Sequence, residues 1–182
     1  MFTYILDDDT ELRPLEPAHA RHIYQLIDQS RSYLRQWLSW VDATTSVQAS
    51  EDYVRAALTQ SMENGGFTAG IWYKDQLAGI IGFHEINWNH RTVGIGYWLG
   101  ENYQGHGLVT SALRVMVDYA LLELNLHRVE VRCATANKRS RAVPERLGFI
   151  LEGIIRETEL LPSGYVDHAV YGMLQQEWKL KR

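Results

Sequence analysis

Hydrophobic residues recur along this chain with two periods, and the changes of period divide it into helices and strands. After Pro17 the apolar positions Ala20, Ile23 and Ile27 repeat at helical spacing, which predicts a helix there. Similar spacing predicts further helices over residues 46–64, 108–120 and 137–147. Runs rich in β-branched and aromatic residues predict strands over residues 11–15, 67–73, 77–84, 91–100, 127–134, 149–160 and 165–174.

The order of these elements predicts an α/β domain that spans residues 1–182. Strand 91–100, the helix after it and strand 127–134 form a βαβ unit, in which the two strands are parallel. Short polar turns at residues 74–76 and 161–164 predict two hairpins. No repeat, linker or low-complexity segment interrupts the pattern.

Composition narrows the function classes. The chain has 182 residues, 46% of them hydrophobic and 22% charged, with a formal net charge of −4. This balance argues against a general nucleic-acid binder. The single cysteine, Cys133, excludes an internal disulfide and favours a reducing compartment. With no apolar run of membrane-spanning length and no basic-then-apolar start, we expect a cytoplasmic protein without membrane or direct nucleic-acid binding.

The segment Gln104-Gly105-His106-Gly107 lies between a predicted strand and a predicted helix. A glycine-rich turn there leaves main-chain N–H groups unpaired at the positive end of the helix dipole, which suits a phosphate or pyrophosphate. The turn lacks the third glycine of the dinucleotide fingerprint, where Thr110 stands, and the Gly-Lys-Ser/Thr ending of the P-loop. The alternative is a tight loop without a ligand.

A second helix start follows the neighbouring parallel strand. Asn137 is a good N-cap, and Lys138, Arg139, Arg141 and Arg146 add positive charge beside it. Ligands of open α/β sheets bind at such carboxyl ends of strands. A capped helix with a solvated basic face is the alternative, but two converging helix starts favour an acyl-CoA or nucleotide pocket.

From about residue 11 to residue 177 the chain resembles the GNAT N-acetyltransferases, and is most similar to their RimJ/RimL branch. The matching segments are residues 94–100 (GIGYWLG), 103–107 (YQGHG), Asn137 with Ser140, 147–149 (LGF), 151–153 (LEG), Arg156 and 164–167 (GYVD). The resemblance implies acetyl-CoA as co-substrate and a primary amine as acceptor. It also implies a mixed central sheet, splayed between two parallel strands and covered by helices on both faces.

The resemblance also assigns the cofactor site. The main-chain N–H groups from Gln104 to Thr110 would hold the pyrophosphate, Asn137 would contact pantetheine with Lys138 beside it, and a strand-edge N–H near Leu99 would polarise the thioester carbonyl. The residues expected to bind acetyl-CoA are therefore Leu99, Gln104, Gly105, His106, Gly107, Leu108, Val109, Thr110, Asn137, Lys138 and Ser140. Val109 departs from the small residue that ends the family motif.

Acetyl transfer needs a base for the amine. Glu159 is the first candidate, because the RimL-like pattern places an acidic residue there. Strand alternation puts Glu157 on the same face as Glu159, and two such carboxylates hold a proton more readily than one. Glu85 is the alternative base, with His84 beside it. A further alternative is that Glu157 and Glu159 are solvated glutamates of a hairpin without a catalytic role.

The leaving thiolate needs an acid. Many family members have a tyrosine as this acid, at the position that Pro144 occupies here. The resemblance to the RimL branch therefore implies Ser140 as the proton donor. Pro144 lacks an N–H and is expected to leave the Ser140 carbonyl free, one helical turn earlier. The alternative for Ser140 is a helix cap.

These features predict an acetyl-CoA-dependent N-acetyltransferase that acts by direct attack in a ternary complex, most simply on the N-terminal amine of a ribosomal protein. A small-molecule amine acetyltransferase and a non-catalytic acyl-CoA-binding module are the alternatives. Tyr33, Trp37 and Trp40 would either shape the acceptor site or pack in a core. A homo-oligomer is possible, and no metal is expected, because His19 and His22 lack further ligands nearby.

Overall fold

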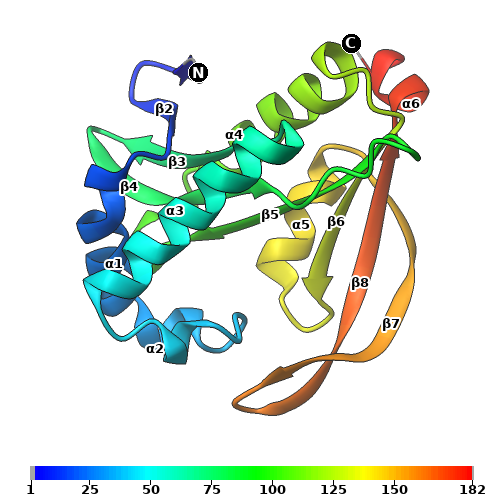
Figure 1. Ribbon diagram of the computed structural model, residues 1–182. Coiled ribbons are helices and arrows are strands. Elements are labelled where there is room, and N and C mark those ends of the chain that lie inside the picture. Colours follow the sequence, from blue (N-terminus) through cyan, green and yellow to red (C-terminus); the bar gives the residue numbers. More distant parts are fainter. Residues whose placement is uncertain (1–2, 182) are drawn as a thin grey trace.

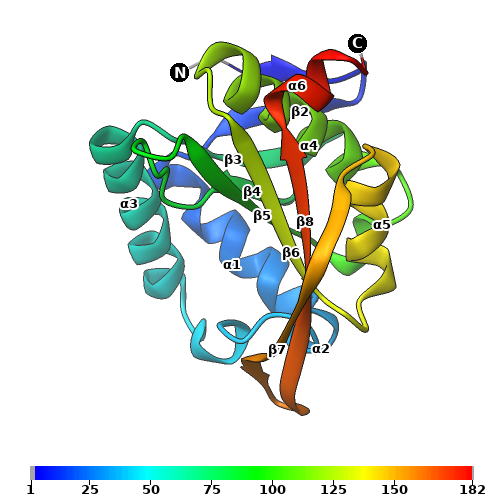
Figure 2. The same cartoon turned by 90° about the vertical axis from the view of Figure 1, so that its right-hand side faces the viewer.

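The computed structural model describes residues 3–181, which form a mixed sheet with helices on both faces (Figures 1 and 2). The strand order within these residues is β1-β2-β3-β4-β5-β6-β8-β7. The strands are β1 (Tyr4–Ile5), β2 (Thr10–Pro14), β3 (Thr68–Tyr73), β4 (Gln76–Phe83), β5 (Thr92–Leu99), β6 (Arg128–Ala134), β7 (Ile150–Leu161) and β8 (Gly164–Leu174). The helices are α1 (Ala20–Gln29), α2 (Arg31–Leu34), α3 (Val47–Asn64), α4 (Leu108–Asp118), α5 (Lys138–Arg146) and α6 (Gln175–Lys179).

The periodicity of the sequence located every longer element, with ends displaced by one or two residues. It did not predict the short elements β1, α2 and α6, because a segment of two to five residues is too short to show a helical or strand period. The hairpin between β3 and β4 turns on Lys74 and Asp75, whose φ angles of 50° and 61° are those of a type I′ turn. No helix in residues 3–181 combines the length and apolarity needed to cross a bilayer.

Each face of the sheet has its own hydrophobic core. On one face α1 and α3 pack over β3 and β4, burying Ile23 and Val54 against Ile80. On the other face α4 buries Leu113 and Met116, together with residues of β3 to β6 and β8. This confirms the expected three-layer arrangement, and it means that the sheet itself separates the two halves of the molecule.

The two parallel strands β5 and β6 pair only at their beginnings. Residues 92–94 of β5 are in register with residues 128–130 of β6, after which no pairing joins them. β5 continues to Leu99, where it still pairs with β4, and β6 continues to Ala134 alongside β8. The strands therefore separate towards their carboxyl ends, as the resemblance implied, and leave the inner edge of β5 without a neighbour.

The close contact of β4 with β5 depends on Gly79. A Cβ atom at this position would overlap with the carbonyl oxygen of Trp98 on β5. Gly79→Ala is expected to lower the free energy of unfolding by about 1–3 kcal/mol, since the backbone must shift to relieve the overlap. Chemical denaturation measures this, with Gly153→Ala on β7 as the matched control because its Cβ would meet nothing within 4 Å. Equal losses in the two variants would contradict the prediction.

Candidate active site

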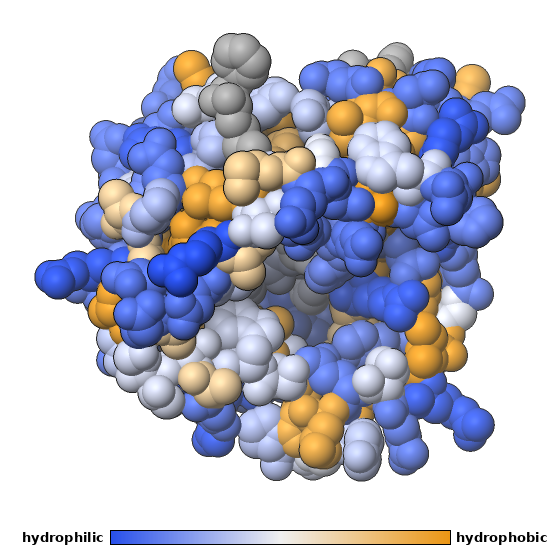
Figure 3. Space-filling view, in the orientation of Figure 1, coloured by the Kyte–Doolittle hydropathy of each residue, from blue (hydrophilic) through white to orange (hydrophobic). Residues whose placement is uncertain are grey.

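A cavity of about 1600 Å³ occupies the gap between β5 and β6 and extends beneath α3. Figure 3 shows it as a hollow in the middle of the face that Figure 1 presents. Its walls come from β4, β5 and β6, from the starts of α4 and α5, from α3, from the loop after α2 and from the β7–β8 hairpin. Most of the residues singled out from the sequence converge here, although they come from distant parts of the chain.

The start of α4 closes one end of the cavity with exposed main-chain N–H groups. Gly105 and Gly107 have φ angles of 83° and 75°, and a Cβ atom at either would meet nothing within 4 Å. Within the described residues, the N–H groups of residues 104–110 donate no hydrogen bond, and the first helical bond starts at Ser111. An anion can therefore bind these amides without displacing an internal partner.

Gln104 connects this helix start with that of α5. Its Oε1 accepts a hydrogen bond from the guanidinium of Arg139, while its Nε2 is buried without a partner in the structure. Asn137 caps α5 as expected, because its Oδ1 accepts from the N–H of Ser140 at 3.1 Å. The two positive helix ends and Arg139 thus surround one end of the cavity, which is suited to a diphosphate.

The free edge of β5 offers an N–H group to the cavity at Leu99. The Gly100 N–H donates to Ala78 of β4 at 2.8 Å, and the His84 N–H donates to Gly94 at 2.9 Å. Successive residues of a strand direct their N–H groups to opposite sides, so the N–H of Leu99 points away from β4 into the gap. This is the orientation that the sequence assigned to a group polarising a thioester carbonyl.

Ser140 lies in the first turn of α5, beside Tyr97 and Cys133. Its Oγ is 3.2 Å from the sulfur of Cys133 and 3.5 Å from the Tyr97 hydroxyl. Since Asn137 supplies the cap, the side chain of Ser140 is free of that role. The Ser140 carbonyl is the group freed by Pro144, as expected, and it accepts a hydrogen bond from the Tyr97 hydroxyl at 2.9 Å. Burial raises the pKa of Tyr97 far above its ordinary value and also raises the pKa of Cys133, so both side chains are neutral donors.

Glu159 lines the cavity, but the prediction that Glu157 shares its face was wrong. The pairing of β7 with β8 shifts between Ile155 and Glu159, which produces a bulge, and Glu157 there has a φ of 48°. A bulge breaks the alternation on which the prediction rested. Thr158 lines the cavity with Glu159, whereas Glu157 does not and donates its N–H to Asp167. The expected pair of carboxylates is therefore absent.

Three of the sequence candidates lie outside the cavity wall. Glu85 lines a separate groove along α3, the side chain of His106 stacks on Tyr73, and Lys138 does not line the cavity. His84 does line it, and the surrounding protein lowers the pKa of its ring by desolvation. Of the two carboxylates considered as base, only Glu159 faces the cavity.

The structure also brings residues to the cavity that the sequence did not single out. His168, from β8, contacts Glu159, and Tyr97 contacts Ser140, and both line the cavity; Ser39, from the loop after α2, contacts Glu159 without lining it. Tyr53 and Trp98 join Trp37 and Trp40 in an aromatic wall. No local pattern marks these residues, because their role comes from segments that meet only in the folded chain.

Residues 9–150 match the family described as Acetyltransferase (GNAT) domain. This match covers most of the chain and includes both helix starts. The chain belongs to the GNAT acetyltransferase family. The splayed parallel strands and the exposed amides of this GNAT domain are the features that its sequence predicted, and the comparison confirms the fold class.

Relatives of this GNAT domain extend over nearly its whole length. It is 34% identical over 180 residues to YdaF of Bacillus subtilis, whose assignment as a ribosomal N-acetyltransferase is itself provisional, with 98% of each chain covered. It is 30% identical over 172 residues to the ribosomal-protein-serine acetyltransferase of Escherichia coli, with 94% of this chain and 96% of that one covered. A solved structure of RimL, the ribosomal L7/L12 α-N-protein acetyltransferase, superposes with a TM-score of 0.91 at 25% identity, covering 97% and 99% of the chains. That structure contains coenzyme A in a disulfide with one of the protein's cysteines.

Proposed function

We propose that this GNAT protein transfers the acetyl group of acetyl-CoA to the α-amine of a protein N-terminus. The observation that carries the proposal is one cavity whose wall includes both the unpaired main-chain amides at the start of α4 and Glu159. The relatives named as acetylating ribosomal proteins support this class of acceptor.

The residues at the start of α4 fit the diphosphate of acetyl-CoA. Among the described residues, the N–H groups of residues 104–110 and the buried Nε2 of Gln104 have no hydrogen-bond partner, and open space lies beside Gly105 and Gly107. The several oxygens of a diphosphate can supply acceptors to these donors. The acyl end would then extend along the free edge of β5 towards Leu99.

The chemistry follows from groups at the centre of the cavity. The Leu99 N–H donates to the thioester oxygen as the amine nitrogen attacks the carbonyl carbon, and Glu159 takes a proton from the amine, through a water where needed. When the carbon–sulfur bond breaks, the Ser140 hydroxyl gives a proton to the thiolate and takes one back from solvent, while Glu159 releases the amine's proton to solvent, so that one proton in total passes from nitrogen to sulfur. A thiol with a pKa near ~8.5 needs only modest help to leave.

An α-amine is the acceptor that places the smallest demand on this base. Its pKa near ~8 leaves about one molecule in ten neutral at pH 7, whereas a lysine near ~10.4 is neutral about once in two thousand. A single carboxylate is therefore sufficient for an N-terminal substrate. Trp37, Trp40 and Trp98 would contact the first residues of the acceptor.

Acceptor profiling tests the proposal. Thiol release from acetyl-CoA is measured with a panel of N-terminal peptides, lysine-containing peptides blocked at the N-terminus, polyamines and amino acids. We expect turnover to be fastest with free N-termini. Turnover with small amines alone would support a small-molecule acetyltransferase instead, and binding of coenzyme A without thiol release would support a non-catalytic module.

Gly107→Val is expected to weaken coenzyme A binding at least about tenfold. The side chain would enter the space beside the exposed N–H groups of residues 104–110, here called the amide cradle, and would strain a residue with positive φ. Isothermal titration calorimetry with coenzyme A measures the Kd. Gly164→Val is the matched control, since Gly164 also has a positive φ with nothing within 4 Å of its Cβ, but lies at the tip of the β7–β8 hairpin. The same Kd increase in both variants would indicate general strain and not a lost binding site.

A further inference from the structure

The bulge in β7 determines which residue stands next to Glu159. Ile155 is opposite His168, and Glu159 is opposite Val166, so four residues along β7 correspond to two along β8. In a regular hairpin continuing from Ile155, Glu159 would stand opposite Gly164, far from His168. The bulge places it diagonally beside His168 on the same face of the sheet, within reach of a long side chain.

The two carboxylate oxygens of Glu159 have separate partners. His168 Nε2 lies 2.8 Å from Oε2, while the Ser39 hydroxyl donates to Oε1 at 2.8 Å. An ionised carboxylate has no hydrogen to donate, so Nε2 of His168 carries the proton in this contact. Both side chains are mostly shielded, with 17% of His168 and 24% of Glu159 exposed, which strengthens the bond relative to one in bulk water.

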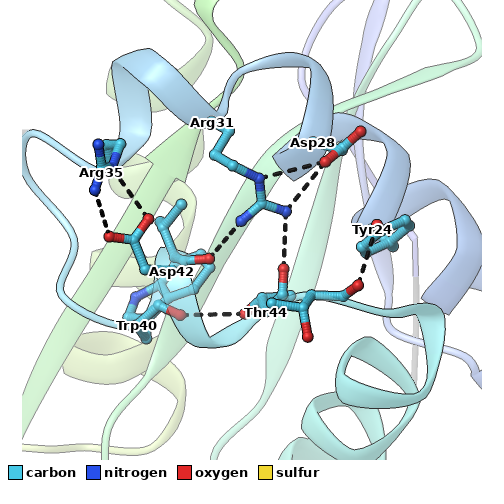
Figure 4. Close-up of polar contacts among 9 residues, drawn as sticks. Tyr24, Asp28, Arg31, Arg35, Trp40, Asp42 and Thr44 are labelled. Carbon is cyan, nitrogen blue, oxygen red and sulfur yellow. Dashed lines mark hydrogen bonds and ion pairs between the residues drawn. The ribbon is translucent and has the colours of Figure 1, made fainter.

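Ser39 belongs to a loop that is held in place from outside the cavity. Figure 4 shows Arg31 reaching across this loop, where its guanidinium donates to the carbonyls of Val41 at 2.7 Å and Thr44 at 2.8 Å. Arg35 forms a two-point ion pair with Asp42, at 3.0 and 2.7 Å, and this pair holds the pKa of Asp42 below its ordinary value. The loop therefore offers the Ser39 hydroxyl at a defined place.

We propose that His168 is a positioning residue for acetyl transfer, which holds Oε2 of Glu159 so that Oε1 is presented to the amine or to its bridging water. This role rests on the proposed function of Glu159. His168 lines the cavity and contacts Oε2 from β8, the strand paired with the one that carries Glu159. Ser39 donates to Oε1 from the loop after α2, and Ser39 does not line the cavity.

The two partners are thus expected to affect catalysis differently. Loss of His168 lets the carboxylate rotate away from the amine, and small misplacements of a reacting group have large costs in rate. Loss of the Ser39 hydroxyl leaves the main-chain N–H of Ser39 as a donor to Oε1, at 3.4 Å, and leaves His168 on Oε2. We expect His168→Ala to act mainly on kcat, and Ser39→Ala to leave kcat within about threefold.

The conservative variant His168→Gln separates positioning from folding. The Gln amide nitrogen can occupy nearly the place of Nε2 and donate the same hydrogen bond, but it cannot ionise. His168→Ala is expected to lower kcat about tenfold or more with the KM for acetyl-CoA unchanged, and His168→Gln to restore kcat to within about threefold of the wild type. Circular dichroism confirms that each variant is folded before kinetics are measured.

A double-mutant cycle with Glu159→Gln then tests whether His168 acts through Glu159. In the Glu159→Gln background, His168→Ala is expected to cause little further loss of kcat, because the group that it positions is gone. An equal loss in both backgrounds, a His168→Gln variant as slow as His168→Ala, or unchanged kcat in His168→Ala would each overturn the role of His168 alone. A wild-type protein that releases no thiol with any amine would overturn the proposed function, and this role with it.

Discussion

Glu159→Gln is expected to lower kcat for acetyl transfer by about 10²–10⁴-fold, the range that a general base contributes. The amide keeps the size of the side chain but cannot accept the proton from the amine. Since the hydrogen-bond partners of Glu159 are Ser39 and His168, and neither belongs to the start of α4 or α5, the Kd for coenzyme A is expected to stay within about threefold. Stopped-flow or continuous thiol assays with an N-terminal peptide measure kcat, and calorimetry measures the Kd.

Glu157→Gln is the matched control for this experiment. Glu157 is two residues away on the same strand, carries the same charge and lies outside the cavity wall, so its replacement should leave kcat nearly unchanged. Glu85→Gln tests the other carboxylate that the sequence offered, and its place in a separate groove predicts little effect. A large loss of kcat in Glu85→Gln, together with a small one in Glu159→Gln, would identify Glu85 as the base and refute the proposal for Glu159.

Tyr97→Phe is expected to lower the free energy of unfolding by about 1–3 kcal/mol, the cost of leaving a shielded carbonyl without a partner. Pro144 has no N–H, so the Ser140 carbonyl lacks the usual helical donor four residues on and accepts from the Tyr97 hydroxyl, at 2.9 Å. Pro144→Ala returns an N–H to the position one turn after Ser140. In that background the carbonyl regains a helical partner, and the cost of Tyr97→Phe should fall.

Chemical denaturation of the wild type, the two single variants and the double variant measures this coupling directly. Tyr103→Phe is the control, because its hydroxyl bonds Gln76 at an exposed site and its loss should change stability by less than about 0.5 kcal/mol. An identical cost of Tyr97→Phe with and without Pro144 would show that the missing helical N–H does not explain the contact. The same variants report on catalysis, since Tyr97 also fixes the backbone that presents Ser140 to the cavity.

The order of elements and one end of the site were determined by local sequence alone. The helical and strand periods are properties of adjacent residues, and they located β5, α4 and β6 and so the parallel pair between them. The amide cradle is local too, since Gly105 and Gly107 adopt positive φ within the same turn that starts the helix. The cap of Asn137 on Ser140 and the free carbonyl opposite Pro144 follow from spacings of three and four residues. Each of these could be predicted, because the interacting groups lie within one helical turn.

The other end of the site was decided by tertiary structure. Strict alternation placed Glu157 beside Glu159, but the bulge opposite Asp167 removed Glu157 and brought His168 to Glu159. A bulge depends on the register in which two strands pair, and the sequence of either strand alone does not determine that register. The contact of Ser39 with Glu159 joins residues 120 positions apart, and it forms only because the loop after α2 and the β7–β8 hairpin approach one another across the splayed sheet. The sequence therefore determined the turn with exposed amides at the start of α4, whereas the surroundings of Glu159 depended on contacts between segments that are distant along the chain.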